Sequence, residues 1–420
     1  MKRLIGYTAA LCLLAIMVGC GGVTSTGTLA YISNSTGSGF TVFTVNTDGT
    51  LTKSSISPQA TPAAPKVLQF AANGKWAYFL DEAGSNIYAY TRAGNGTLAT
   101  LIDAYPVGPN ASSLVVAPNS TFLYVALPAT KKLAIYSIDQ STGILSQVGS
   151  NQPIGYAVTQ LVMAPGGGLL FGLAGVYPPP PASNGVSQQS VLTWTLSSSS
   201  GVATGPLTQP VGISPSYIAL STNGSYLYVL DSTATTNIGN AAVNCQTSPN
   251  ATTACSPNIY AFTVASSGAL TTMAGSPFNE NPDANGLYPT NPIAAATSND
   301  SRYLFVANQG SHNVSAFKIS SSPNAGVLSE VLGSVSIVNG ISTSTASPFD
   351  CGTGCVTPSF VAVSNSNNAL YVIDPGGSAV NGNATGKIFQ FQIDQSTGKL
   401  RAQNPAFVTA EGGPTWITIR

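Results

Sequence analysis

The sequence predicts an all-β protein: a seven-bladed β-propeller in which each blade is a four-stranded antiparallel sheet. Three observations in the chain of 420 residues predict this fold. Apolar runs of strand length, separated by turns rich in Gly, Asn, Pro and Ser, occur in groups of four. A glycine in the turn before the last run recurs seven times, at positions 49, 96, 143, 201, 268, 326 and 398. The first group lacks its opening run, whereas one extra run ends the chain.

The stretch 112–147 shows one complete group. Its apolar runs are 114–116, 122–125, 133–138 and the short 144–145. These runs are rich in Val, Ile, Tyr and Phe, which favour strands. The middle runs show little alternation between apolar and polar residues, so we expect both faces of these strands to be covered.

The other groups repeat this plan along the chain. Their main runs are 29–32 and 40–45; 67–70, 76–80 and 87–90; 161–164, 169–173 and 191–196; 217–220, 226–230 and 259–264; 293–296, 303–306 and 314–319; and 360–363, 370–373 and 388–393. The extra run 416–419 is predicted to be the innermost strand of the incomplete first blade, beside 29–32. This pairing would close the ring and leave no broad open sheet edge.

Residues 1–19 are predicted to be a secretion signal that is not part of the fold. Two basic residues precede an apolar core at 11–18, which is too short for a membrane-spanning helix. The segment Met17-Val18-Gly19-Cys20 resembles a bacterial lipobox, which implies that Cys20 is acylated and becomes the mature N-terminus. Residues 20–27 are then the lipidated cysteine and its tether, and 28–420 a single propeller domain. An ordinary signal peptide, cleaved near Gly22, is the alternative.

Charge and composition favour a neutral extracytoplasmic protein. Charged residues are only 7% of the chain, and once Lys2 and Arg3 are removed, 12 Lys+Arg stand against 14 Asp+Glu. Without a basic cluster, nucleic acid is not an expected partner. We expect a monomer in the cell envelope, held to a membrane by its lipid. The Gly21 that follows Cys20 implies the outer membrane.

Four further cysteines lie in two local pairs. Cys245 is near Cys255, and Cys351 is near Cys355. In an oxidising compartment such pairs favour two disulfides. A zinc site is the alternative, but the spacings and the single histidine of the chain do not favour it.

Several segments resemble the lactonase-like, or 6-phosphogluconolactonase-like, seven-bladed propellers with YVTN repeats. The resemblance rests on 122–125 (FLYV), 226–229 (YLYV), 304–308 (LFVAN) and the turn IDQSTG, which occurs at both 138–143 and 393–398. It extends over essentially all of 29–420. It implies the propeller fold but informs little about activity, because this fold carries many functions.

The loops of the predicted propeller are unequal on its two faces. Loops from the first to the second strand, and from the third to the fourth, are tight. The long insertions are expected on the opposite face, which we call the long-loop face; they are 175–189, 232–257, 275–288, 336–357 and 375–386. Long loops on a rigid scaffold often carry function, so the long-loop face is the predicted working face.

Candidate site residues gather at this face. The second strand ends in an amide or an acid in five blades: Asn34, Asp81, Asp231, Asn308 and Asp374. Together with Glu411, these groups could bind a ligand or a divalent cation; apart from that cation, no cofactor is expected. Alternatively, each group could cap its own backbone. The resemblance implies a further role for His312, because 308–314 is similar to a stretch of the lactonase-like proteins. His312 could be a catalytic base or simply a polar loop residue.

Two functions remain open at this point. The face holds Asp81, Glu82, Asp231, Glu280, Asp283, Asp350, Asp374 and Glu411, against Lys66, Lys131, Lys132 and Lys387, and no arginine is expected there. Such a face repels a phosphorylated substrate. The first hypothesis is a lipid-anchored binding or scaffolding module for a protein or glycan partner. The second is a hydrolase of an unphosphorylated lactone or sugar, with His312 or one of the acids as base.

Overall fold

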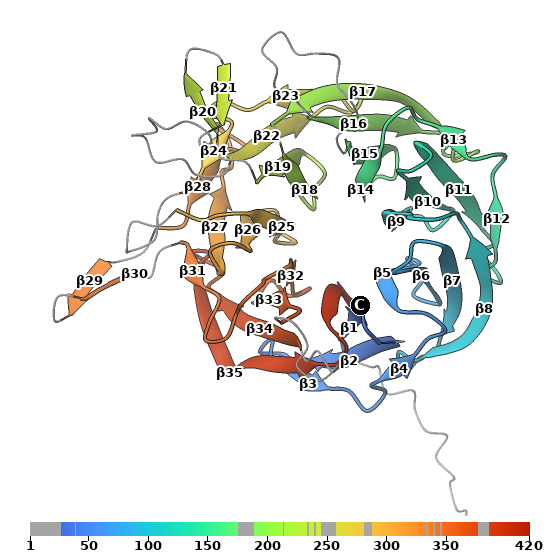
Figure 1. The fold of residues 1–420 in the computed structure, drawn as a ribbon, viewed down its shortest axis with the longest axis horizontal. Helices are drawn as coiled ribbons and strands as arrows, with labels where there is room; N and C mark the ends of the chain where they lie inside the picture. The colour runs from blue at the N-terminus through green and yellow to red at the C-terminus, as the bar shows by residue number, and fades with distance from the viewer. Residues whose placement is uncertain are drawn as a thin grey trace, which may run out of the picture.

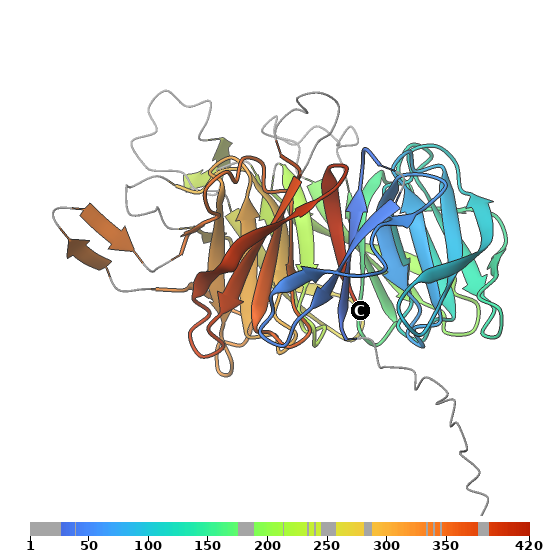
Figure 2. The same cartoon turned by 90° about the horizontal axis from the view of Figure 1, so that it is seen from below.

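The computed structural model is a ring of β-sheets around a central axis (Figures 1 and 2). It describes residues 27–37, 39–174, 189–212, 214–232, 258–280, 288–332, 347–376 and 386–420, together with the backbone of four strands at 235–238, 241–244, 335–338 and 341–344. The predicted secretion signal, Cys20, Cys245 and Cys255 lie outside the described residues.

Seven sheets form the blades, as predicted. Blade 1 contains β36 (Pro414–Ile419), β1 (Leu29–Asn34), β2 (Gly39–Val45), β3 (Leu51–Lys53) and β4 (Gln59–Ala60), and blade 2 contains β5 (Pro65–Phe70), β6 (Trp76–Asp81), β7 (Asn86–Arg92) and β8 (Leu98–Pro106). Blade 3 contains β9 (Ser113–Val116), β10 (Phe122–Leu127), β11 (Lys132–Ile138), β12 (Leu145–Gln147) and β13 (Gln152–Pro153), and blade 4 contains β14 (Val158–Met163), β15 (Leu169–Ala174), β16 (Gln189–Leu196) and β17 (Ala203–Val211). Blade 5 contains β18 (Pro215–Leu220), β19 (Tyr226–Asp231), β22 (Asn258–Val264), β23 (Leu270–Thr272) and β24 (Phe278–Asn279). Blade 6 contains β25 (Pro292–Thr297), β26 (Tyr303–Asn308), β27 (Asn313–Ile319), β28 (Leu328–Glu330) and β31 (Phe349–Asp350), and blade 7 contains β32 (Phe360–Val363), β33 (Ala369–Asp374), β34 (Gly386–Ile393) and β35 (Leu400–Ala410).

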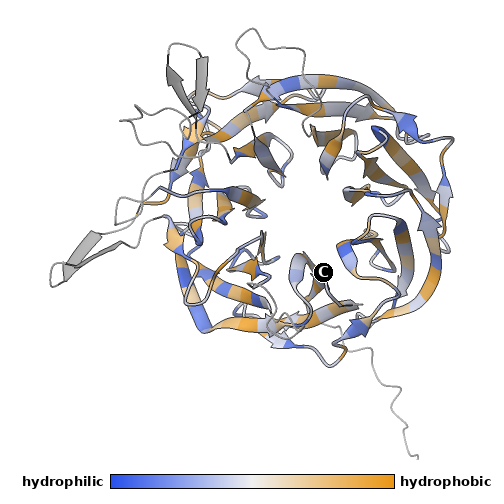
Figure 3. Cartoon of the chain, viewed as in Figure 1, coloured by the Kyte–Doolittle hydropathy of each residue, from blue (hydrophilic) through white to orange (hydrophobic). Residues whose placement is uncertain are grey.

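The C-terminal strand closes the ring. β36 pairs antiparallel with β1, with Tyr31 opposite Thr418 and Ser33 opposite Trp416. The backbone N–H of Leu29 also donates to the carbonyl of Arg420 at 2.7 Å. The prediction that 416–419 completes the first blade is therefore confirmed. In Figure 3 the orange, hydrophobic segments recur on the strands all around the ring, where they form the core between blades.

The outer strands are less regular than the sequence predicted. In blades 1, 3, 5 and 6 the fourth strand is split into two short pieces that pair with the same third strand. In blade 6 these pieces are β28 and β31, and the hairpin of β29 (Val335–Val338) and β30 (Ile341–Ser344) lies between them in sequence. Figure 2 shows this hairpin projecting sideways from the ring. The prediction that the whole insertion 336–357 lies on the long-loop face is therefore wrong. The other small hairpin, β20 (Thr235–Ile238) with β21 (Ala241–Asn244), follows β19 in blade 5.

A repeated tyrosine joins five of the seven blades to the next blade. The third residue of the second strand is tyrosine in five blades, and its hydroxyl donates to the carbonyl of the turn glycine in the following blade. The bonds are Tyr31–Gly96 at 2.5 Å, Tyr78–Gly143 at 2.9 Å, Tyr124–Gly201 at 3.0 Å, Tyr228–Gly326 at 2.9 Å and Tyr371–Gly49 at 2.6 Å. We call these bonds the tyrosine latches. Five of the seven recurring glycines that the sequence revealed are thus inter-blade acceptors.

The turn glycine cannot be replaced, as Gly143 shows. Its φ is +76°, which is strained for any residue with a side chain. An added Cβ would also clash with the ring of Trp76, the first residue of the second strand in the preceding blade. Glycine therefore meets two requirements at this position: it turns the chain, and it lets the adjacent blade approach closely.

Candidate functional site

The carboxylates that end the second strands are hydrogen-bonded to the backbone of adjoining loops. Asp81, at the end of β6, accepts from the backbone N–H of Ser85 at 2.6 Å. Asp374, at the end of β33, accepts from the backbone N–H of Val356 at 2.5 Å and of Gly376 at 2.8 Å. Both side chains are almost fully buried. These contacts are the ones expected from the backbone-capping alternative, because each acid orders a loop at the long-loop face.

Asp231 and Asn34 end their strands in a similar way. Asp231 is fully buried, and it accepts from the backbone N–H of Ser214 at 3.0 Å. Gly212 lies so close that an added Cβ would overlap the Asp231 carboxylate. Asn34 donates from Nδ2 to the Thr41 hydroxyl at 3.0 Å. Each predicted strand-end group thus has a partner in its own neighbourhood, and the structure does not bring them together into one cluster.

Glu411 and His312 are both on the surface. Glu411 forms an ion pair with Lys53, with 2.7 Å between Oε1 and Nζ. The two side chains are 59% and 51% exposed, so this pair contributes at most about 1 kcal/mol. His312 lies in the turn between β26 and β27 with a φ of +56°, and its carbonyl accepts from the N–H of Cys351 at 3.2 Å. Its imidazole is exposed at the corner of blade 6.

The innermost strands carry bulges that the sequence analysis missed. Between Pro65 and Val67 the pairing of β5 with β6 shifts register, which leaves Lys66 as an extra residue. The same shift occurs in β18 after Pro215 and in β25 after Pro292. Bulges often occur beside functional sites, where they redirect a side chain. The sequence signal was present, because a proline precedes the extra residue in all three strands.

Lys66 and Glu82 lie near one another in blade 2, where the backbone N–H of Glu82 donates to the carbonyl of Ala64 at 2.8 Å. Lys66 lies on the innermost strand of blade 2, and its Nζ is 3.5 Å from the carbonyl of Ala111. Glu82 follows Asp81 in the turn between β6 and β7, and it is exposed. Desolvation raises the pKa of Glu82, the positive charge of Lys66 lowers it, and the charge of Asp81 adds to the rise. Glu82 is therefore an accessible carboxyl with a raised pKa.

Three aromatic rings of the innermost strands meet near the same face. The ring centroids of Phe360 and Trp416 are 4.1 Å apart, and those of Tyr217 and Phe360 are 6.4 Å apart. Phe360 belongs to blade 7, Trp416 to blade 1 and Tyr217 to blade 5. In its sheet, each of them lies opposite the residue that precedes the acid or amide at the end of the second strand. Burial raises the pKa of Tyr217. Aromatic side chains therefore connect the innermost strands of blades 1, 5 and 7 on this side of the ring.

A buried polar cluster occupies the corner of blade 6. Glu280, 1% exposed, follows β24 of blade 5 and reaches the ends of β26 and β27. Its Oε2 accepts from Asn308 Nδ2 at 3.0 Å and from the hydroxyl of Ser315. Asn308 Nδ2 is also 3.0 Å from Asn313 Oδ1. Desolvation raises the pKa of Glu280 to about 8, the Ser315 and Asn308 bonds oppose the rise, and the charge of Glu330 adds to it.

One of the two predicted disulfides lies in the described part of the chain. Cys351 and Cys355 are bonded with 2.08 Å between their sulfurs, so this prediction is confirmed. Lys387 contacts the same loop, with its Nζ 3.5 Å from the carbonyl of Gly354 and 4.4 Å from the Phe407 ring centroid. This lysine is thus held beside the disulfide loop.

The arginines of the described residues lie away from the long-loop face. Arg92 contacts the Tyr31 hydroxyl and the Phe70 ring, and Arg420 donates to the Ala72 carbonyl at 2.5 Å. Arg302 and Arg401 begin or precede strands at the tight-turn end. In this part of the chain no group of three or more His, Cys, Asp and Glu residues could hold a metal ion. Within the same residues, no helix is long and apolar enough to cross a membrane.

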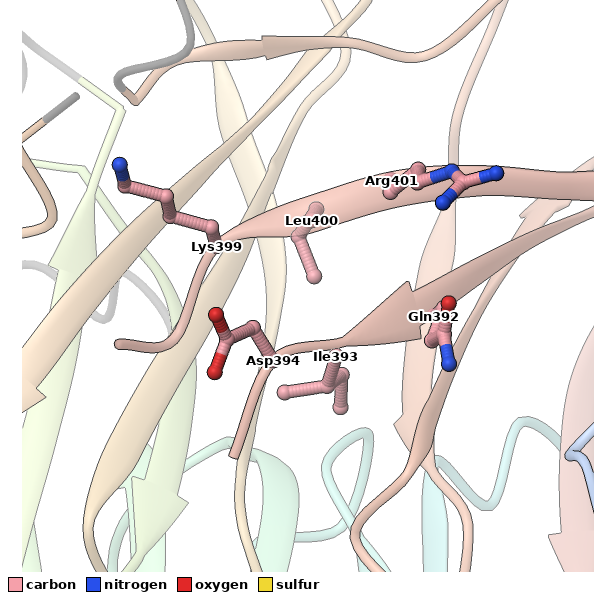
Figure 4. Close-up of a pocket in the computed structure, with 6 residues that line it drawn as sticks. All are labelled: Gln392, Ile393, Asp394, Lys399, Leu400 and Arg401. Atoms are coloured by element: carbon pink, nitrogen blue, oxygen red, sulfur yellow. The ribbon is translucent and has the colours of Figure 1, made fainter. Parts of the chain in front are cut away.

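A surface hollow of about 530 Å³ lies on the outer hairpin of blade 7. Figure 4 shows Ile393 and Leu400 in its middle, with Asp394 and Lys399 at one end and the remaining lining residues, Gln392 and Arg401, at the other. The hydroxyl and backbone N–H of Ser396 lower the pKa of Asp394 to about 2. This carboxylate accepts hydrogen bonds within the turn between β34 and β35. We therefore do not assign the functional site to this hollow.

Comparisons with known proteins agree with the fold. A family model described as "Lactonase, 7-bladed beta-propeller" matches residues 41–171. A 6-phosphogluconolactonase from Serratia proteamaculans is 29% identical over 110 residues, which are 24% of this chain. The matching stretch spans 33% of the length of that relative.

Solved structures with low sequence identity share the fold over nearly the whole chain. A periplasmic gluconolactonase from Pseudomonas aeruginosa has a TM-score of 0.63 at 15% identity, covering 93% of this chain and 98% of its own. A candidate 6-phosphogluconolactonase from Bacteroides fragilis has a TM-score of 0.64 at 16% identity, covering 94% of this chain and 99% of its own. At this identity the likeness indicates the fold alone.

Proposed function

We propose that this seven-bladed β-propeller, which is similar to the lactonase family over residues 41–171, hydrolyses an uncharged lactone on the long-loop face, at the inner ends of the blades. The observation that carries this proposal is the placement of Glu82, an exposed carboxyl whose pKa is raised by desolvation, near enough to Lys66 on the bulge of the innermost strand for the lysine charge to act on it. Lactone hydrolysis needs a base that activates water and a group that stabilises the oxyanion. Glu82 supplies the base, and Lys66 supplies the group that stabilises the oxyanion.

The proposed chemistry uses one water molecule. The carboxylate of Glu82 accepts a proton as the water oxygen bonds to the lactone carbonyl carbon. Lys66 stabilises the negative charge that develops on the carbonyl oxygen. The bond from the acyl carbon to the ring oxygen then breaks, and the ring oxygen takes the proton from Glu82. The product is the open-chain hydroxy acid. The partly exposed ring of Trp416, which packs against the buried Phe360, offers an apolar surface for the substrate ring.

The charges at this face favour an unphosphorylated substrate. No arginine of the described residues lies there, and two of the predicted lysines are engaged: Lys66 Nζ lies 3.5 Å from the Ala111 carbonyl and near the charge of Glu82, and Lys387 contacts Phe407. A buried phosphate without a paired cation would lose several kcal/mol. We expect sugar lactones without a phosphate to be preferred over 6-phosphogluconolactone.

The test is a panel of lactones assayed by the acid that they release. Glu82→Gln should lower kcat/KM by about 10²–10⁴, whereas Asp103→Asn, on the outer strand of the same blade, should leave it unchanged. Lys66→Met should lower the rate and also shift the pH profile upward, because it removes the charge that lowers the pKa of Glu82. Full activity in Glu82→Gln, with loss in His312→Ala, would move the chemistry to blade 6.

A second candidate function is a binding module for a protein or glycan. The observation that favours it is that the carboxylates of Asp81, Asp231 and Asp374 accept hydrogen bonds from backbone N–H groups of loops. The face then acts as an ordered platform without a catalytic acid cluster. The absence of turnover with every lactone, combined with retained binding of one of them in calorimetry, would favour this function.

We also propose that Cys20 anchors the protein to a membrane. β1 begins at Leu29, at the tight-turn end of blade 1. The tether would therefore reach the ring on the face opposite the long-loop face. Cys20→Ser should release the protein from the membrane fraction. If the variant stays entirely with membranes, another segment holds it there.

A further inference from the structure

We propose that Glu280 and Asn308 form a proton-controlled tie between blades 5 and 6. Glu280 directly follows β24, which belongs to the sheet of blade 5. Its carboxyl group, however, binds Asn308 and Ser315 in the second and third strands of blade 6. The tie is closed when the carboxyl group is neutral and opens when it ionises.

Two unpaired oxygens point to the neutral carboxyl group. Oε1 of Glu280 and Oδ1 of Asn308 are both buried, and neither has a hydrogen-bond partner. As acceptors only, they would each lose the free energy of an unmade hydrogen bond. A proton on Oε1 converts one of them into a donor. In the proposed tie, Nδ2 donates to Oε2 as the structure shows, and the protonated Oε1 donates to Oδ1.

The surroundings favour the neutral form. Glu280 is 1% exposed, while Asn308 and Ser315 are fully buried. The charged group that acts on Glu280 is another acid, Glu330 of β28, and its charge also raises the pKa. On β31, Asp350 stands opposite Asn313, and His312 lies exposed in the adjoining turn. Burial without a paired cation is the main condition that keeps a carboxyl group protonated.

The direction of the pH effect follows from the difference between the pKa of Glu280 in the folded chain and in the unfolded chain. In the unfolded chain Glu280 ionises near its ordinary pKa of about 4.5, and in the folded chain near about 8. Its contribution to stability is therefore complete below about pH 4.5 and is lost as pH rises through about 8. Above that pH the tie itself carries a buried negative charge, so the contact between β24 and blade 6 should loosen.

The experiment compares the full chain with Glu280→Gln, in which a neutral amide replaces the neutral acid. Between pH 5 and pH 9 we expect Tm to fall by roughly 2–5 °C more in the parent than in Glu280→Gln. Hydrogen exchange at 278–280 and 308–315 should accelerate in the parent above pH 8 and stay unchanged in the variant. Asp103→Asn, an exposed acid, should behave as the parent.

A second variant, Glu330→Gln, tests the predicted direction of the pH effect. It removes the negative charge that raises the pKa of Glu280, so the exchange transition should move to lower pH. Identical pH profiles for parent and Glu280→Gln would overturn the proposal. A stabilisation by Ca²⁺ or Mg²⁺ that disappears in Glu280→Gln would also overturn it, because a cation would then satisfy the two oxygens. These readouts are independent of lactone turnover, so they stand or fall separately from the proposed activity.

Discussion

The third residue of each second strand decides whether a blade junction has a tyrosine latch. Five blades have tyrosine there, while blades 4 and 6 have Phe171 and Phe305. Burial raises the pKa of the latch residue Tyr124 to about 12, so the hydroxyl stays protonated and donates throughout the neutral range. In blade 6, Tyr303 bonds to the carbonyl of Gln395 at 3.2 Å and partly replaces the missing latch. Blade 4 has no such substitute among the bonds of its second strand in the described chain.

A single added hydroxyl should therefore strengthen the junction between blades 4 and 5. We predict that Phe171→Tyr raises the free energy of unfolding by about 1 kcal/mol, because it supplies the donor for the Gly268 carbonyl. Tyr124→Phe should lower it by about the same amount. Chemical denaturation of both variants checks this. A destabilised Phe171→Tyr would mean that the core of blade 4 has no room for the oxygen.

The strand-end acids also give a prediction at this scale. Asp374→Ala removes the acceptor of the N–H groups of Val356 and Gly376. We expect it to cost about 1–3 kcal/mol of stability, because buried donors lose their partner. Asp103→Asn, at an exposed site, should cost less than about 0.5 kcal/mol. If Asp374→Ala is as stable as the parent but loses ligand affinity, the group serves a ligand and not the backbone.

At the scale of strands and loops, the sequence predicted the strands that repeat from blade to blade and missed the features that lack a repeated pattern. The inner three strands of every blade were predictable, because the same apolar run and turn recur in each group. The split outer strands were not, since their short polar pieces resemble loops. The role of Glu280 was also hidden: in the sequence it belongs to a loop after blade 5, and only the fold brings it to Asn308. The strand-end acids stayed ambiguous because capping and ligand binding require the same residue at the same place.

The disulfide loop between blades 6 and 7 gives a prediction for one element. Cys351 and Cys355 close a very short loop, and chain entropy predicts a contribution of about 2 kcal/mol for a loop of this size. Replacing both cysteines with serine should lower stability by about that amount. Mass spectrometry before and after reduction should show one disulfide here; a free thiol at either position in oxidised protein would contradict the structure.

At the scale of the whole molecule, stability depends on closing the ring. Without β36, the inner edge of β1 has no partner, and Phe360 loses its contact with Trp416. We predict that a chain ending at residue 413 aggregates or melts well below the parent without a cooperative transition. Trp416→Phe, which keeps the strand but shrinks the ring system, should still melt cooperatively. A truncated chain that is monomeric and melts at the parent temperature would contradict this.

Pairing of the last strand with the first has a consequence for how the protein is made. β1 is the first strand of the ring to leave the ribosome, and its partner β36 is the last. During translation six blades can complete their sheets, but the first blade must wait until β36 has been synthesised. Closure of the ring therefore follows the synthesis of every other strand of the propeller. A premature stop codon after position 413 would remove a single strand, yet it acts as a mutation of the protein core.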